Sequence, residues 1–138
     1  MRNLSVAAGL AVLFWATSTP AASYDCPAAI AVRQAIVAVP AGWSGFEDQD
    51  AHPLAAVSLS EGEPSKQATL VPDSSRRKGK LAVTTWRFTA SSEGYWLSCL
   101  YGGTSMGVTR KLPDGVKSCR VEGDAQIDPP SPTKIECQ

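Results

Sequence analysis

The stretch from Gly94 to Cys119 constrains the fold most, because it alternates short apolar runs with strong turn signals. Tyr95 to Tyr101 places aromatic and apolar side chains at every second position, which is typical of a half-buried strand. Met106 to Leu112 and Val116 to Glu122 are two further strand candidates. A glycine pair and a Pro-Asp-Gly turn separate the three segments. We predict three short antiparallel strands here.

The remainder of the chain keeps this rhythm, with turn signals roughly every 8–12 residues. Such spacing predicts an all-β fold: a single small antiparallel sandwich or barrel of short strands. Ala28 to Val39 is the ambiguous segment. Its valine and isoleucine content and Pro40 favour a strand, whereas an alanine-rich helix there would make the fold α+β. Further strand candidates are Leu54 to Leu59, Ala68 to Val71, Leu81 to Thr89 and Thr133 to Cys137, and Pro72 to Lys80 is expected to form a loop.

The amino terminus has the layout of a secretory signal peptide. Arg2 precedes an apolar run of thirteen residues, Leu4 to Ala16, and small residues follow up to Ser23. The run is shorter than the ~20 residues that a membrane-spanning helix needs. The residues before Cys26 do not suit a lipoprotein signal. We therefore expect residues 1–23 to be removed, leaving one soluble domain, 24–138, in the periplasm or secreted, without a membrane anchor.

Four cysteines, Cys26, Cys99, Cys119 and Cys137, lie in the expected mature chain. An even number in an exported protein predicts two disulfides. Three pairings are possible, and we favour Cys99–Cys119 with Cys26–Cys137, because one bond would close a local loop and the other would tie the two ends together. Since no C-x-x-C pair occurs and the single histidine is distant from every cysteine, we expect no metal and no cofactor.

Charge is balanced overall but unevenly distributed. Residues 24–65 hold six acidic side chains and one basic, residues 66–120 hold ten basic and three acidic, and residues 121–138 hold four acidic and one basic. A net charge near zero argues against general binding to nucleic acid or to an acidic membrane. Either these charges pair within the fold, or they create patches that dock a charged protein.

The sequence offers no convincing catalytic group, so we expect no enzymatic activity. His52 precedes a proline in a polar segment, where an exposed loop histidine is the ordinary interpretation, and no serine lies in a G-x-S-x-G motif. Two acidic pairs, Glu61 with Glu63 and Glu47 with Asp50, could be proposed as glycosidase carboxylates. Both have few apolar neighbours to raise a carboxyl pKa, so solvated surface acids are the better interpretation.

Several short motifs resemble a family of small exported bacterial proteins that is catalogued as uncharacterised. The resemblance covers most of the expected mature chain and implies a periplasmic, disulfide-containing domain with no enzymatic role. Some members of that family resemble the partners encoded beside secreted antibacterial effectors. The motifs are Cys26-Pro27, Pro40-x-Gly42-Trp43, Trp86-x-Phe88, Tyr95-Trp96-x-x-Cys99-x-Tyr101-Gly102-Gly103-Thr104, Leu112-Pro113, Cys119 and Cys137.

These features favour a non-enzymatic, monomeric protein-binding module, most concretely an immunity-type inhibitor of a secreted toxin or cell-wall hydrolase. Its partner contacts would lie in loops carried by a rigid scaffold. One alternative is an envelope protein that binds a small ligand or glycan in a groove formed by Trp43, Trp86 and Trp96. Another is a structural accessory of the envelope. The candidate contacts are Trp43, Phe46, Glu47, Asp48, Asp50, Arg76, Arg77 and Lys78.

Overall fold

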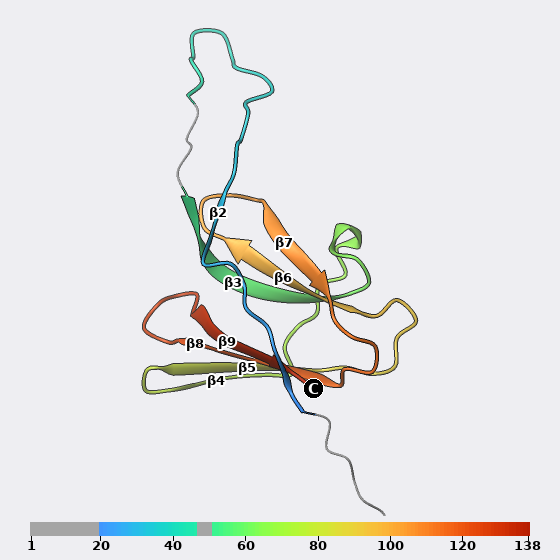
Figure 1. Ribbon diagram of the computed structural model, residues 1–138. Coiled ribbons are helices and arrows are strands. Elements are labelled where there is room, and N and C mark those ends of the chain that lie inside the picture. Colours follow the sequence, from blue (N-terminus) through green and yellow to red (C-terminus); the bar gives the residue numbers. More distant parts are fainter. Residues whose placement is uncertain (1–19, 47–50) are drawn as a thin grey trace, which may run out of the picture.

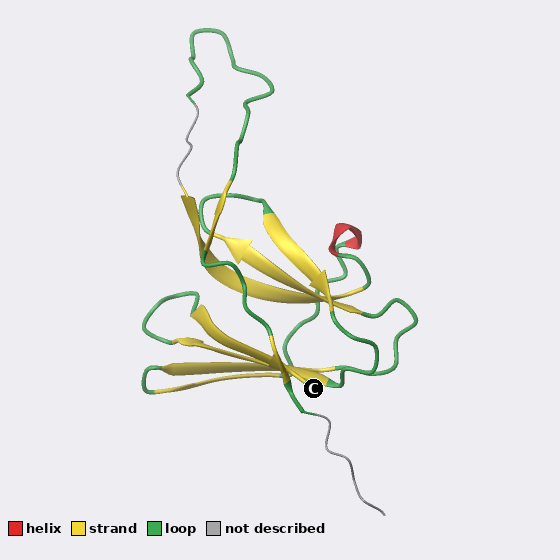
Figure 2. Cartoon of the chain, viewed as in Figure 1, coloured by secondary structure: helices red, strands yellow, loops and turns green. Residues whose placement is uncertain are grey.

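The computed structural model describes residues 20–46 and 51–138, and these form two antiparallel β-sheets facing each other (Figure 1). The all-β prediction is confirmed, since the described residues contain strands, loops and one short 3-10 turn, Pro64–Lys66 (Figure 2). None of that helical structure is long or apolar enough to span a membrane. The strands are β1 (Ala22–Ser23), β2 (Ala29–Ala31), β3 (Ala51–Glu61), β4 (Ser74–Lys78), β5 (Leu81–Arg87), β6 (Tyr95–Tyr101), β7 (Gly107–Lys111), β8 (Ser118–Asp124) and β9 (Ser131–Cys137).

The five-stranded sheet has the order β1-β9-β8-β5-β4, and the four-stranded sheet has the order β2-β3-β6-β7. β6 and β7 form the expected hairpin, but β8 crosses to the other sheet, where it pairs with β5 and β9. The chain therefore does not form a three-strand meander between residues 94 and 122. β4 also differs from the sequence prediction, because it is a strand within a segment that was expected to be a loop.

The core lies between the two sheets and follows the period-two patterns of the strands. Ala82 and Trp86 on β5 point inward as expected, and Leu59 on β3 is fully buried. The indole of Trp86 donates a hydrogen bond to the carbonyl of Leu70 at 3.2 Å, which satisfies its one polar atom inside the core. The buried cluster consists of Tyr24, Leu59, Trp86, Tyr95, Leu97, Leu112, Cys119, Val121, Ile135 and Cys137.

All four cysteines form disulfides, as predicted, but the favoured pairing was wrong. Cys119 bonds to Cys137, its direct neighbour across the β8–β9 pair. Cys26 bonds to Cys99 on β6 and so fastens the amino-terminal segment to the four-stranded sheet. The pairing Cys99–Cys119 assumed that both cysteines belonged to one meander, and the crossing of β8 to the other sheet removes that assumption.

The segment from Ala28 to Val39 contains only the three-residue strand β2, and its later residues are irregular. No α-helix forms there, so the α+β alternative was wrong. Residues 1–19 lie outside the described part of the chain. Ala22 and Ser23, at the end of the predicted signal peptide, form β1 and pair with Cys137 and Glu136 of β9.

Candidate functional site

A long connection projects from the four-stranded sheet between β2 and β3 (Figure 1). Its described part, residues 32–46, is irregular and is here named the apolar arm. Connections longer than about 12–15 residues without secondary structure are uncommon in compact domains and usually serve a function. Val37 is 101% exposed, Phe46 83% and Trp43 77%, and Ile36 and Val39 are also exposed. Large apolar side chains so fully in water mark an interaction site.

Local turn chemistry holds the tip of the arm in shape. The amide of Trp43 donates to the carbonyl of Pro40 at 3.1 Å, closing a four-residue turn. Gly42 has φ +85° at the third position of this turn, where glycine is strongly preferred. Lower in the arm, a Cβ on Gly45 would lie 2.8 Å from the Cδ1 atom of Ile36, so the two legs of the arm pass close to each other. The arm thus packs on itself more than on the body.

The β6–β7 hairpin lies beside the base of the arm. The side-chain amide of Gln34 reaches the carbonyl of Gly103 in the β6–β7 turn at 3.5 Å. Three exposed apolar side chains, Leu100, Met106 and Val108, come from this hairpin. We use the name apolar pole for residues 32–46 plus Leu100, Met106 and Val108; Val108 pairs with Cys99, so it points to the opposite face of the sheet from Leu100. The apolar pole holds eight of the eleven exposed large hydrophobic side chains in the part of the chain that the structure describes.

His52 fixes the β6–β7 turn beneath the arm. Its Nδ1 atom lies 2.8 Å from the carbonyl oxygen of Gly102, and because a carbonyl only accepts, Nδ1 carries the proton. Gly103 follows with φ +74°, and a Cβ there would lie 3.2 Å from the same ring nitrogen. The histidine is buried on β3, so the expectation of an exposed loop residue was wrong. Its Nε2 atom is buried without a hydrogen-bond partner among the described residues.

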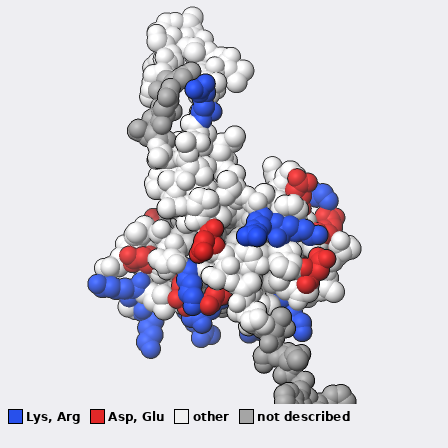
Figure 3. All heavy atoms as spheres, viewed as in Figure 1, with Lys and Arg blue, Asp and Glu red and all other residues white. Residues whose placement is uncertain are grey.

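The arm is almost free of charge. Arg33 is the one charged residue among positions 32–46, and Figure 3 shows the projection as a nearly uncharged surface with a single basic side chain. The body below it carries intermingled basic and acidic side chains (Figure 3). Several of these charges form exposed ion pairs, such as Lys66 with Glu93 at 2.7 Å, where the carboxylate raises the pKa of the lysine. The pole therefore differs from its surroundings in polarity.

The structure separates the two groups of predicted partner contacts. Trp43 and Phe46 lie exposed on the arm. Arg76, Arg77 and Lys78 lie on β4, an edge strand of the five-stranded sheet, which is on the side of the molecule away from the arm (Figure 1). Arg77 forms an exposed ion pair with Asp128 at 3.1 Å. The predicted contacts Glu47, Asp48 and Asp50 lie outside the described residues.

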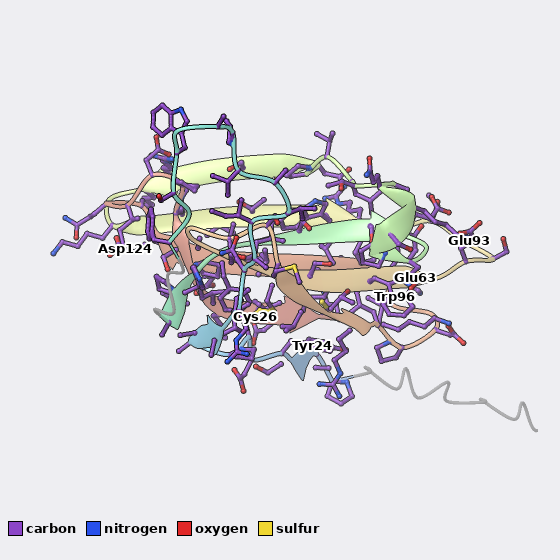
Figure 4. All side chains as sticks on the ribbon, turned by 90° about the horizontal axis from the view of Figure 1, so that it is seen from above. Tyr24, Cys26, Glu63, Glu93, Trp96 and Asp124 are labelled. Atoms are coloured by element: carbon purple, nitrogen blue, oxygen red, sulfur yellow. A yellow bond between two sulfur atoms is a disulfide. The ribbon has the colours of Figure 1, made fainter. Side chains whose placement is uncertain are left out.

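The three tryptophans proposed for a ligand groove do not meet. Trp43 is on the arm, whereas Trp86 is in the core and lines, with Val57 and Val121, a groove of about 260 Å³ between the sheets. Trp96 is the second residue of β6 and lies near Glu63 and Glu93, away from the arm, when the molecule is viewed from above (Figure 4). The expected three-tryptophan groove was therefore wrong.

Within residues 20–46 and 51–138, no group of three histidine, cysteine, aspartate or glutamate side chains could hold a metal ion. Glu61 is exposed at the end of β3, and Glu63 lies next to the short 3-10 turn. What the site offers is a projecting apolar surface on a disulfide-braced body. Such a surface can bury itself in another macromolecule.

Sequence reasoning missed six of the eight apolar residues of the pole. Ile36, Val37 and Val39 were assigned to a strand because of their β-branched side chains. Yet Val37 directly follows Ile36, so any alternating strand would have left one of the two outside the core. The apolar residues just before the turn at Pro40 do not alternate with polar ones, and this was the sequence feature that could have predicted their exposure. Leu100, Met106 and Val108 gave none, because the same residues would suit a hairpin that packs inward.

Comparison with known proteins places the chain in a family. A family model described as the type VI secretion system Tli immunity protein matches residues 48–138. An uncharacterized 16.3 kDa protein from the trpG 5′ region of Azospirillum brasilense is 36% identical over 128 residues, covering 85% of each chain. No solved structure matches the chain. The protein therefore belongs to the family of type VI secretion system Tli immunity proteins.

Proposed function

We propose that the protein is an immunity-type inhibitor that binds a secreted toxin and blocks its action. The family match across β3 to β9 is the observation that carries this proposal, because immunity is what the family's description states. Inhibition of this kind requires a stable complex rather than catalysis. The apolar pole supplies a surface for that complex, since its exposed Trp43 and Phe46 are of the type that anchors protein interfaces.

The apolar pole, rather than the basic strand β4, makes the main contact in this proposal. Arg76 and Lys78 are charged residues on an exposed sheet edge, and lysines and arginines at such edges protect a sheet from pairing with other chains. The pole has no comparable structural explanation, because exposing its side chains to water gains nothing for the fold. The acidic residues Glu47, Asp48 and Asp50, which follow the arm in the sequence, belong to the proposed contact region.

The proposal places the protein in the periplasm, exported by residues 1–23. The two disulfides are consistent with an oxidising compartment. Cleavage after Ser23 would remove β1 but keep the hydrogen bond from the Tyr24 amide to the Ile135 carbonyl and the bond from Cys26 to Cys99. Amino-terminal sequencing of the protein from a periplasmic extract should start at Tyr24. A chain that keeps Met1 and stays in the cytoplasm would contradict this part.

Co-production with a toxin provides the functional test, and the candidates are toxins encoded next to the protein's gene. Bacteria that produce this toxin in the periplasm should survive only when the immunity protein is co-produced with its signal peptide. The two purified proteins should form a complex of fixed stoichiometry by size-exclusion chromatography with light scattering. Unchanged toxicity together with no complex, for every toxin encoded next to the gene, would refute the proposal.

A further inference from the structure

We infer that the apolar arm binds the toxin by inserting Trp43 and Phe46 into an apolar cleft of that protein. This inference rests on the proposed function and adds which element enters the toxin and what kind of surface receives it. The family model begins at residue 48, so the arm at residues 32–46 lies outside the part that is matched. The matched part contains β3 to β9, which supply most of the core. The Azospirillum relative aligns with 85% of this chain, a stretch long enough to include the arm.

The arm carries apolar area that the fold does not use. None of its five large apolar side chains belongs to the buried core cluster or packs against it. The arm is joined to the body by the three residue pairs of β2 with β3 and by the contact from Gln34 to Gly103. Its shape comes from its own turn at residues 40–43 and from the close approach of its two legs. Substitutions in the arm can therefore change binding while leaving the fold intact.

The shape and polarity of the arm specify the surface that it fits. The arm is a narrow projection, and long projecting loops bind by entering concave surfaces (Figures 1 and 3). With Arg33 as its one charge, it complements an apolar cleft and not a charged one. An anionic bilayer is a poorer match, because loops that bind such membranes carry several cations. Here the residues that follow the arm in sequence include Glu47, Asp48 and Asp50.

The β6–β7 hairpin borders the base of the arm. The carbonyl of Gly103 in its turn accepts the contact from Gln34, and His52 holds the neighbouring Gly102 carbonyl. The hairpin therefore supports the base from which the arm projects, while Trp43 and Phe46 provide the side chains that enter the cleft.

The double variant Trp43→Ala/Phe46→Ala tests the arm, and Val71→Ala is the matched control. Val71 is 87% exposed and apolar but lies outside the pole. By isothermal titration calorimetry with the toxin, we expect the double variant to weaken binding by about 100-fold or more, as truncation of two anchor residues does. The control should keep its affinity within about 2-fold, as expected outside a hot spot. Binding should also change little between low and high salt, because the contact is apolar.

The outcomes separate this inference from the proposed function. If the wild-type protein binds and neutralises the toxin but the double variant does so equally well, the arm does not enter the toxin, and the immunity function stands. If the wild-type protein does not bind the toxin, both ideas fail. If the wild-type protein, but not the double variant, binds phosphatidylglycerol vesicles instead of the toxin, the inference that the arm enters a protein cleft is wrong. It is also wrong if the arm instead joins two copies of this protein in a dimer that depends on Trp43.

Discussion

Of the two disulfides, the bond between Cys26 and Cys99 should make the larger entropic contribution to the free energy of unfolding. It joins residues 73 positions apart, whereas Cys119–Cys137 joins residues 18 apart on strands that are already paired. A disulfide restricts the unfolded chain more when the loop that it closes is longer. The perturbation is therefore the double replacement Cys26→Ala/Cys99→Ala, compared with Cys119→Ala/Cys137→Ala.

The chain-entropy relation gives the expected sizes. For a separation of 73 residues it predicts a loss of about 4 kcal/mol, and for 18 residues about 3 kcal/mol. Near the melting temperature, 1 kcal/mol corresponds to about 4 °C for a domain of this length. Loss of the Cys26–Cys99 bond should then lower Tm by about 16 °C. Cys119 and Cys137 are fully buried, so their replacement adds a packing cost to the entropic one.

Urea unfolding followed by tryptophan fluorescence measures the free energy of unfolding of each double variant. The free energy of unfolding should fall as stated, and the m-value should rise more for Cys26→Ala/Cys99→Ala, because its unfolded state exposes more surface. The single variant Cys26→Ala tests the pairing itself: alkylation after denaturation should label Cys99 alone. Labelling of Cys137 instead, or a stability loss below about 1 kcal/mol in the double variant, would refute the reasoning.

Three further variants test the core and the base of the arm. Leu59→Ala removes a fully buried side chain and should cost about 2–5 kcal/mol in urea unfolding; a loss below about 1 kcal/mol would contradict its core position. Gly103→Ala forces an alanine to φ +74° against His52 and should cost about 1–3 kcal/mol, whereas no loss would mean that the turn is free to relax. Burial raises the pKa of Tyr101 above its ordinary value of 10.0, so the folded state holds this proton more tightly than the unfolded state. The stability that this raised pKa contributes is complete below pH 10 and is lost as the pH rises further. Tyr101→Phe should therefore reduce the fall of Tm at alkaline pH. An equally steep fall in the variant would contradict the raised pKa of Tyr101.

Alternation along the strands allowed much of the fold to be predicted. Tyr95 to Tyr101 and Leu81 to Arg87 are strands because their apolar side chains recur at every second residue, and both lie where expected. Local periodicity carries no information on which sheet a strand joins. The placement of β8 beside β9 depends on contacts between residues far apart in the sequence, and the disulfide pairing was wrong for the same reason.

The candidate site was only partly predictable. Trp43 and Phe46 were expected to contact a partner, and the structure leaves both exposed, although their role in binding is untested. The remaining apolar residues of the arm were taken as strand residues, because β-branched composition normally reflects burial. In this chain, Ile36 to Val39 are apolar but exposed, so only another molecule would bury them. The segment from Pro72 to Lys80 was taken for a loop because it is polar and rich in turn residues, but Ser74–Lys78 forms an edge strand, where charged residues are common.

Site-specific photo-crosslinking in living cells tests the central claim most directly. The immunity protein would carry benzoylphenylalanine in place of Trp43 on the arm, or in place of Arg76 on β4, and would be produced in the periplasm together with the toxin. The account predicts that irradiation cross-links the toxin to position 43 and not to position 76, because the apolar pole faces the toxin and β4 lies on the other side of the molecule. Cross-linking from position 76 with none from position 43 would contradict it.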